Sequence, residues 1–232
     1  MTLPVFTLFL EPVHPLQFLM VEVRASLASG LSEYMSLPRD ATSSGQVIHR
    51  YPAVQCKQVK DDVVAIGICQ GAGFLRQLAN GKAEILPGKN ACKIVSRDPG
   101  IRDEEFGTGG MYEYEILTPW LALNQQNAKK FYDLKGKPAR DAFMQKILTD
   151  HLNNLAKSLD RTPEKPITCT PHVRFIRERI DRENLIVFLG KFQTNLSIPD
   201  YFGIGQQVSR GYGTVRKIGP VEGTSAGSPA GP

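Results

Sequence analysis

The chain has 232 residues, of which 41% are hydrophobic, so it can bury a core and is not a wholly disordered protein. Lysine and arginine number 28 and aspartate and glutamate 23, and the resulting net charge of +5 permits an anionic partner without requiring one. No apolar run reaches the ~18 residues of a membrane span, and the N-terminal segment lacks the basic start of a signal peptide. We therefore expect a cytoplasmic protein with no membrane partner.

The first half of the chain predicts a β-α-β-β-α-β order. A buried strand is expected at residues 5–10, and apolar positions 23, 27, 31 and 34 have helical spacing. Two strands joined by a turn at Asp61 and Asp62 predict a hairpin, and a short helix and a further strand follow it. The ranges expected for these last four elements are 51–57, 63–69, 71–79 and part of 83–95. This order is the ferredoxin-like arrangement.

The second half repeats this pattern less completely. Thr118 and Pro119 are expected to end a strand that begins at residue 112, and the longest apolar stripe, 143–159, predicts a helix. Strands are expected at 173–176, 185–192 and 214–218, with no clear second helix. We predict an α+β protein of two tandem ferredoxin-like domains. The predicted parts are an N-terminal domain (1–97), a glycine-rich linker (98–110), a C-terminal domain (111–218) and a disordered tail (219–232).

Cysteine and glycine spacing exclude several kinds of site. The four cysteines are too far apart for a paired metal motif, and we expect them to be reduced, with no metal or other cofactor. Two Gly-x-Gly pairs, 203–205 and 211–213, flank Arg210, but the spacing fits neither a dinucleotide fingerprint nor a P-loop. Glycine-rich backbone can form a nest of N–H groups for an anion. A long hairpin with solvated charges explains the segment equally well.

Three segments in order resemble a known family. Residues 202–214 contain a Gly-hydrophobic-Gly sequence, then a basic residue, then a Gly-aromatic-Gly sequence. This pattern resembles the glycine-rich loop of the RAMP superfamily of CRISPR-associated proteins. Residues 50–57 with 65–72 (RYPAVQCK and AIGICQGA) and residues 118–123 (TPWLAL) are similar to further segments of its Cas-six type endoribonucleases. The resemblance implies two ferredoxin-like domains that bind CRISPR repeat RNA and cut it once. It also implies metal-independent cleavage, which leaves a 2′,3′-cyclic phosphate and a 5′-OH.

One departure from the family concerns the catalytic histidine. The related branch has a histidine in the loop that corresponds to 37–44, where this sequence has none. His49 is the substitute that the sequence offers for proton transfer, with Tyr51 as a donor and Lys57 as a cation nearby. Each residue also has a non-catalytic interpretation: His49 as a loop or strand histidine, Tyr51 as a half-buried strand tyrosine and Lys57 as a solvated strand lysine. His14 is a weaker candidate for the same site, His172 is a weaker candidate for RNA contact, and His151 is expected on the flank of the long helix.

The RNA-binding candidates are cations and the glycines of the loop. Arginine binds phosphate through two parallel hydrogen bonds, and Arg177 and Arg179, two positions apart, are expected to share one strand face. A charge ladder paired with Glu178 and Asp181 is the alternative. The predicted contacts are Arg174, Arg177, Arg179, Gly203, Gly205, Arg210, Gly211, Gly213 and Lys217.

Two other functions remain open at this point. The chain is either a repeat endoribonuclease or a noncatalytic RAMP-type subunit that binds guide RNA beside other CRISPR-associated effector subunits. A globular interaction domain without RNA is the third reading. The sequence leaves open whether the protein acts as a monomer or a homodimer.

Overall fold

The computed structural model describes residues 1–12, 51–60, 62–82, 84–85, 92–180 and 183–221. These residues form two compact units. The described residues within 3–104 and 209–211 form the N-terminal unit, and those within 1–2, 105–208 and 212–221 form the C-terminal unit.

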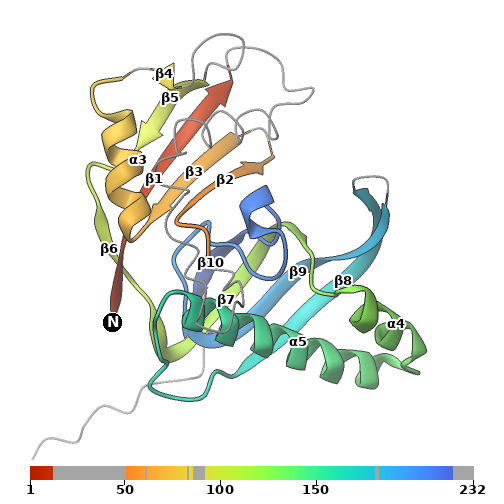
Figure 1. The fold of residues 1–232 in the computed structure, drawn as a ribbon. Coiled ribbons are helices and arrows are strands. Elements are labelled where there is room, and N and C mark those ends of the chain that lie inside the picture. Colours follow the sequence, from red (N-terminus) through yellow and green to blue (C-terminus); the bar gives the residue numbers. More distant parts are fainter. Residues whose placement is uncertain (13–50, 61, 83, 86–91, 181–182, 222–232) are drawn as a thin grey trace, which may run out of the picture. The chain divides into compact units, whose positions relative to one another are not determined.

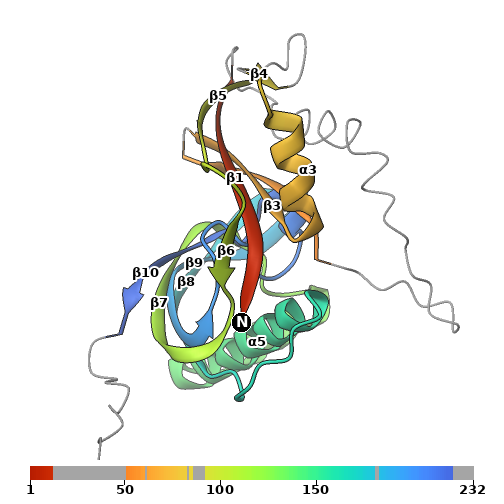
Figure 2. The same cartoon turned by 90° about the vertical axis from the view of Figure 1, so that its left-hand side faces the viewer.

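The sheet of the N-terminal unit has the strand order of a ferredoxin-like domain. Its order is β2-β3-β1-β5-β4, with antiparallel pairing along this path, and β6 also pairs with β1. The strands are β1 (Thr2–Pro12), β2 (Val54–Val59), β3 (Asp62–Ile68), β4 (Glu84–Ile85), β5 (Cys92–Arg97) and β6 (Arg102–Glu105). Helix α3 (Gln70–Ala79) lies along one face (Figures 1 and 2). The helix predicted between β1 and β2 lies outside the described residues.

The core of this unit forms between α3 and the sheet. Leu75 of α3 packs in one cluster with Leu8 of β1 and Cys56 of β2. Cys56 lies opposite Ala65 in the β2–β3 pair, and the next residue, Lys57, lies opposite Val64. Because successive strand residues point to opposite faces, Lys57 points away from α3.

The C-terminal unit repeats the same sheet order, β10-β7-β9-β8. Its strands are β7 (Gly107–Trp120), β8 (Cys169–Ile180), β9 (Glu183–Ser197) and β10 (Val215–Pro220). Helices α4 (Gln125–Asp133) and α5 (Lys137–Ser158) connect β7 to β8 and lie on one face of the sheet (Figure 1). A single turn of 3-10 helix, Val208–Arg210, stands where a second helix would be. The prediction of tandem ferredoxin-like domains is confirmed.

Several elements differ from the sequence prediction. The segment 98–110 contains β6 and the start of β7. Its charged residues, such as Arg102 and Glu104, lack the apolar alternation of a strand, but β6 forms because its backbone pairs with β1 while all its side chains except that of Glu104 stay exposed. β10 continues to Pro220, and the Val221 N–H donates to the Met111 carbonyl at 2.9 Å, so the predicted tail begins inside the sheet. Residues 222–232 lie outside the described part.

β7 also continues past the predicted stop at Thr118 and Pro119, because the pairing with β9 shifts register between Ile116 and Trp120. The irregularity accommodates Pro119, which has no N–H to donate.

No helix in the described ranges is long and apolar enough to cross a membrane.

Candidate functional site

The glycine-rich segment is bound to the end of β7. The Gly213 N–H donates to the Pro119 carbonyl at 2.9 Å, and the Gln206 N–H donates to the Leu121 carbonyl at 3.0 Å. The Thr118 hydroxyl accepts from the Thr214 N–H at 2.9 Å. Two motifs that are about 90 residues apart in the sequence thus form one structure. The Thr-Pro-Trp motif supplies the support on which the glycine-rich segment rests.

Two glycines of this segment are required by close packing. A Cβ on Gly205 would lie 2.5 Å from the indole nitrogen of Trp120, and one on Gly213 would lie 2.0 Å from the Ile204 carbonyl oxygen. Their φ angles, +86° and +64°, are in the left-handed region that favours glycine. The fold of the C-terminal unit therefore accounts for these two glycines without any ligand.

Replacing Gly213 with alanine is expected to lower the free energy of unfolding by more than about 3 kcal/mol, because the Cβ meets backbone and the φ angle is unfavourable. Gly136→Ala tests the φ angle alone, since φ is +83° but an added Cβ would lie 3.8 Å from its nearest neighbour, Cδ of Pro138, and should cost about 1 kcal/mol. Gly219→Ala, with open space and an ordinary φ, should cost less than about 0.5 kcal/mol. Chemical denaturation measures all three. Equal losses in the three variants would contradict the packing argument.

The two cations predicted in and after this segment lie in different settings. Arg210 is half-buried at the end of the 3-10 turn. Lys217, on β10, donates to the Ser197 hydroxyl at 2.7 Å, and its amine lies 4.4 Å from the centre of the Tyr112 ring. Lys217 is therefore already held by neighbours in the C-terminal unit.

The Arg-Tyr-Pro motif also has a structural basis. The Ile68 N–H donates to the Ala53 carbonyl at 2.8 Å. A Cβ on Gly71 would lie 2.0 Å from that same carbonyl oxygen, and one on Gly67 would lie 2.3 Å from the Gly71 oxygen. The two glycines allow the start of α3 to approach the residues that precede β2. This contact fixes the position of the backbone at Ala53, two residues after Tyr51.

Lys57 is the most unusual of the predicted catalytic residues. Its side chain is 0% exposed, and its Nζ has no hydrogen-bond partner among the described residues. Burial lowers its pKa from 10.5 to about 7. Gln55, two residues earlier on the same strand face, has a buried Oε1 that also lacks a partner. Unsatisfied buried polar groups are uncommon and often occur at functional sites.

The other predicted catalytic groups are less defined. Tyr51 is half-buried just before β2. His49 and His14 lie outside the described residues, so the predicted convergence of His49, Tyr51 and Lys57 stays a prediction.

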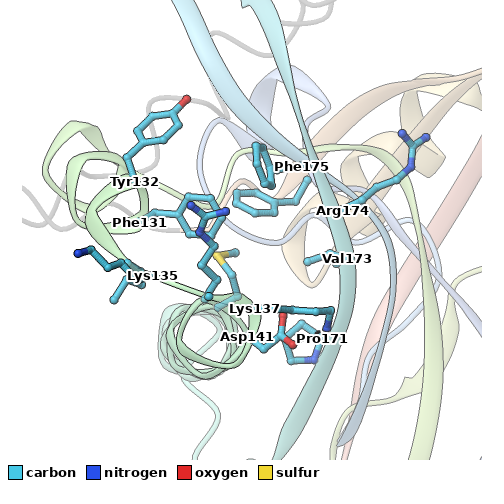
Figure 3. Close-up of a pocket in the computed structure, with 14 residues that line it drawn as sticks. Phe131, Tyr132, Lys135, Lys137, Asp141, Pro171, Val173, Arg174 and Phe175 are labelled. Carbon is cyan, nitrogen blue, oxygen red and sulfur yellow. Dashed lines mark hydrogen bonds and ion pairs between the residues drawn. The ribbon is translucent and has the colours of Figure 1, made fainter.

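The three predicted arginines of β8 divide between the two faces of the sheet. Arg177 and Arg179 are two residues apart and therefore lie on one face of the strand. This is the face toward α4 and α5, but both side chains remain exposed to solvent. The Arg177 Nε donates to the Tyr132 hydroxyl at 3.2 Å. Arg174 extends from β8 away from Tyr132 (Figure 3). The exposed His172 is an even number of residues from Arg174 and is therefore on its face.

His151 is partly buried and contacts Trp120, whereas the leucines around it in the sequence indicate only that it lies on the flank of a helix. The Trp120 indole N–H donates to His151 Nδ1 at 3.2 Å, which links α5 to the support of the glycine-rich segment. Burial lowers the pKa of His151 to about 4, so the ring is neutral and accepts this bond at neutral pH.

Within the described ranges, no group of three or more His, Cys, Asp or Glu side chains is placed to hold a metal ion. The cysteines there are not joined to one another by disulfide bonds.

The two units share the ferredoxin-like sheet order, and the second has a glycine-rich segment in place of its second helix. Models of the Cas6b N-terminal domain and the Cas6b C-terminal domain match residues 1–105 and 107–218. The chain belongs to the Cas6b family.

Individual relatives agree with this assignment. The chain is similar to the crystal structure of a Cas6b, with a TM-score of 0.74, 24% identity, and coverage of 94% of this chain and 100% of that one. A structure titled CRISPR RNA processing endoribonuclease Cas6b has a TM-score of 0.71, 25% identity and the same coverage. An uncharacterized protein of Methanocaldococcus jannaschii is 30% identical over 129 residues, or 54% of this chain and 86% of that protein.

Proposed function

We propose that this protein is an endoribonuclease that binds CRISPR repeat RNA and cuts the precursor transcript into guide RNAs. The observation that carries the proposal is the match of both units, in order, to the two Cas6b domains. The similarity over 94% of the chain to a CRISPR RNA processing endoribonuclease supports the same activity.

The proposed reaction is an internal transesterification. The 2′-oxygen next to the scissile phosphate loses its proton to a base and forms a bond to phosphorus. The P–O5′ bond breaks, and the leaving oxygen takes a proton from an acid. The products are a 2′,3′-cyclic phosphate and a 5′-OH, and no metal takes part.

His49, Tyr51 and Lys57 are the proposed groups for this step. His49 exchanges protons near neutral pH, and Tyr51 supplies a hydroxyl donor. With a pKa of about 7, the Lys57 amine is divided between its charged and neutral forms at neutral pH, so it also fits proton transfer. Because its Nζ is buried, substrate reaches it only when the residues that cover it shift.

RNA binding is assigned to cations and loop glycines of the C-terminal half. The exposed Arg174, Arg177 and Arg179 supply cations along β8, and Arg210 supplies one at the 3-10 turn. Gly203, Gly205, Gly211 and Gly213 shape the backbone that carries Arg210, and Lys217 follows on β10.

The test is incubation of the purified protein with repeat RNA in excess EDTA. Cleavage that leaves a 2′,3′-cyclic phosphate and a 5′-OH supports the proposal. Cleavage that appears only when a divalent ion is restored would overturn the metal-independent step. A protein that binds the RNA but never cuts it is the noncatalytic subunit, and a protein that does neither overturns RNA function.

Replacing Arg210 with alanine is expected to weaken RNA binding and to reduce the salt dependence. One lost phosphate contact lowers the slope of log K against log salt by about 0.7–0.9. Lys146→Ala, which removes an exposed cation from α5, is the matched control and should leave the slope unchanged. Fluorescence anisotropy at several salt concentrations measures both. Equal slopes for Arg210→Ala and the wild type would contradict the contact.

A further inference from the structure

A pocket of about 610 Å³ lies within the C-terminal unit, between its helices and β8. Its wall includes the end of α4, the turn 134–136, the first residues of α5, and Pro171, Val173 and Phe175 of β8 (Figure 3). The volume is in the range of sites that hold small organic ligands. Sequence reasoning missed this pocket because it missed α4. The signals for α4 are the Asn124 side chain, which accepts from the Asn127 N–H at 2.8 Å, and the apolar pair Phe131 and Tyr132.

Aromatic rings form the floor and rim of this pocket. Phe131 is 2% exposed and packs edge-to-face against Phe175 and Phe188, with ring centres 5.3 and 5.6 Å apart. Tyr132 and Phe175 are 44% and 42% exposed. Two partly exposed rings beside a buried ring provide flat apolar surface that a planar ligand can cover.

Cations surround these rings. The Arg140 guanidinium lies 5.4 Å from the centre of the Phe131 ring, and its buried Nε has no hydrogen-bond partner among the described residues. Arg177 lies over the Tyr132 ring at 5.5 Å. Lys135 and Lys137 also line or border the pocket, and Asp141, paired with Lys137, is the one acid in its lining. The lining residues themselves include four cations, Lys135, Lys137, Arg140 and Arg174, and one acid, so the lining has a net charge of +3, and the neighbouring Arg177 adds a further cation.

We propose that this pocket binds an unpaired nucleotide of single-stranded RNA. The base stacks on the exposed faces of Phe175 or Tyr132, and the flanking phosphates lie against Lys135, Lys137 and Arg177. The inference rests on the proposed RNA function and adds a second contact region to it. Base–aromatic stacking together with cations along the backbone is how proteins hold single strands without base pairing.

Charge favours RNA over an apolar peptide as the occupant. A purely apolar segment would satisfy the rings but would leave the excess cations without counter-charges. A nucleotide supplies a planar base for the rings and, on the other side of its ribose, a phosphate for the cations. Lys137 is already paired with Asp141, so Lys135 and Arg177 carry most of the phosphate contact.

The test compares ring-removing and ring-keeping variants of the full chain. Phe175→Leu and Tyr132→Leu should weaken binding of fluorescein-labelled decaadenylate by about 5- to 150-fold, the worth of one stacked base. Phe175→Tyr and Tyr132→Phe keep the rings and should stay within about twofold of wild type. Lys135→Ala should reduce the salt slope, while Lys146→Ala should not. Melting temperatures show whether each variant is folded.

Photocrosslinking gives a readout that does not depend on variants. Wild-type protein irradiated with an RNA decamer that carries 5-iodouridine should crosslink at Tyr132 or Phe175. Crosslinks only elsewhere, or folded leucine variants that bind decaadenylate as wild type does, would overturn the pocket proposal. A wild type that binds neither decaadenylate nor repeat RNA would instead overturn the proposed function.

Discussion

Alanine in place of His49 is expected to slow the cleavage of repeat RNA by about 10²–10⁴-fold, the usual contribution of general acid–base catalysis. His49 precedes Tyr51 and Lys57 in the sequence, and it is the histidine nearest to both along the chain. Because the change removes a proton carrier and no cation that is needed for docking, RNA affinity should stay within about threefold. Single-turnover cleavage and anisotropy measure the two quantities separately.

Two further variants serve as a control for His49→Ala and as a test of a second catalytic group. His172→Ala removes an exposed histidine of β8 and should leave the cleavage rate unchanged. Tyr51→Phe should slow cleavage if its hydroxyl protonates the leaving oxygen. A His49→Ala variant that cuts at the wild-type rate would refute the role of His49, and the proton would then be carried by Lys57 or His14.

The order of strands and helices along the chain was largely predictable from sequence, because each strand is a short apolar segment bounded by turn residues. β2 and β3 form the predicted hairpin, but Asp62 already belongs to β3, where it pairs with Val59, and Asp61 lies outside the described residues. The absence of a second helix in the C-terminal half was also visible, since glycines fill the stretch between β9 and β10.

Tertiary contacts decide the features that the sequence did not show. β6 has the composition of a loop and becomes a strand only because β1 offers it an edge. Pro119 looked like a strand end, but its carbonyl accepts from Gly213, far along the chain. Neither partner is visible in a local window of sequence.

The candidate site shows the same limit. The glycine positions stood out in the sequence, but a nest and a hairpin were equally good explanations. The structure adds a packing requirement at Gly205 and Gly213. For Lys57 the sequence predicts a catalytic cation or a solvated strand lysine but not its burial, because an alternating pattern does not reveal whether the second face of a sheet is also covered.

Replacing Lys57 with methionine is expected to stabilise the protein at neutral pH. The two side chains are similar in length, and methionine has no charge to desolvate. The unfolded chain keeps the Lys57 proton up to pH 10.5, whereas burial lowers the folded pKa to about 7. Between these values the unfolded state binds more protons, so the lysine destabilises the fold increasingly as the pH falls toward 7. At about 1.4 kcal/mol for each pH unit, the gain in Lys57→Met is at most about 5 kcal/mol.

The pH dependence of that gain identifies its cause. The advantage of Lys57→Met should be largest at or below pH 7, shrink by about 3 kcal/mol on going to pH 9.5, and vanish above pH 10.5. Lys82→Met, which removes an exposed lysine of the same unit, should show no such trend. If Lys57 serves the reaction, the stabilised variant should also cut RNA more slowly, which is the trade-off expected where function retains a costly buried group. A Lys57→Met protein that is less stable than wild type at pH 7 would show that the amine has a partner when folded, and an unchanged cleavage rate would remove Lys57 from the catalytic groups.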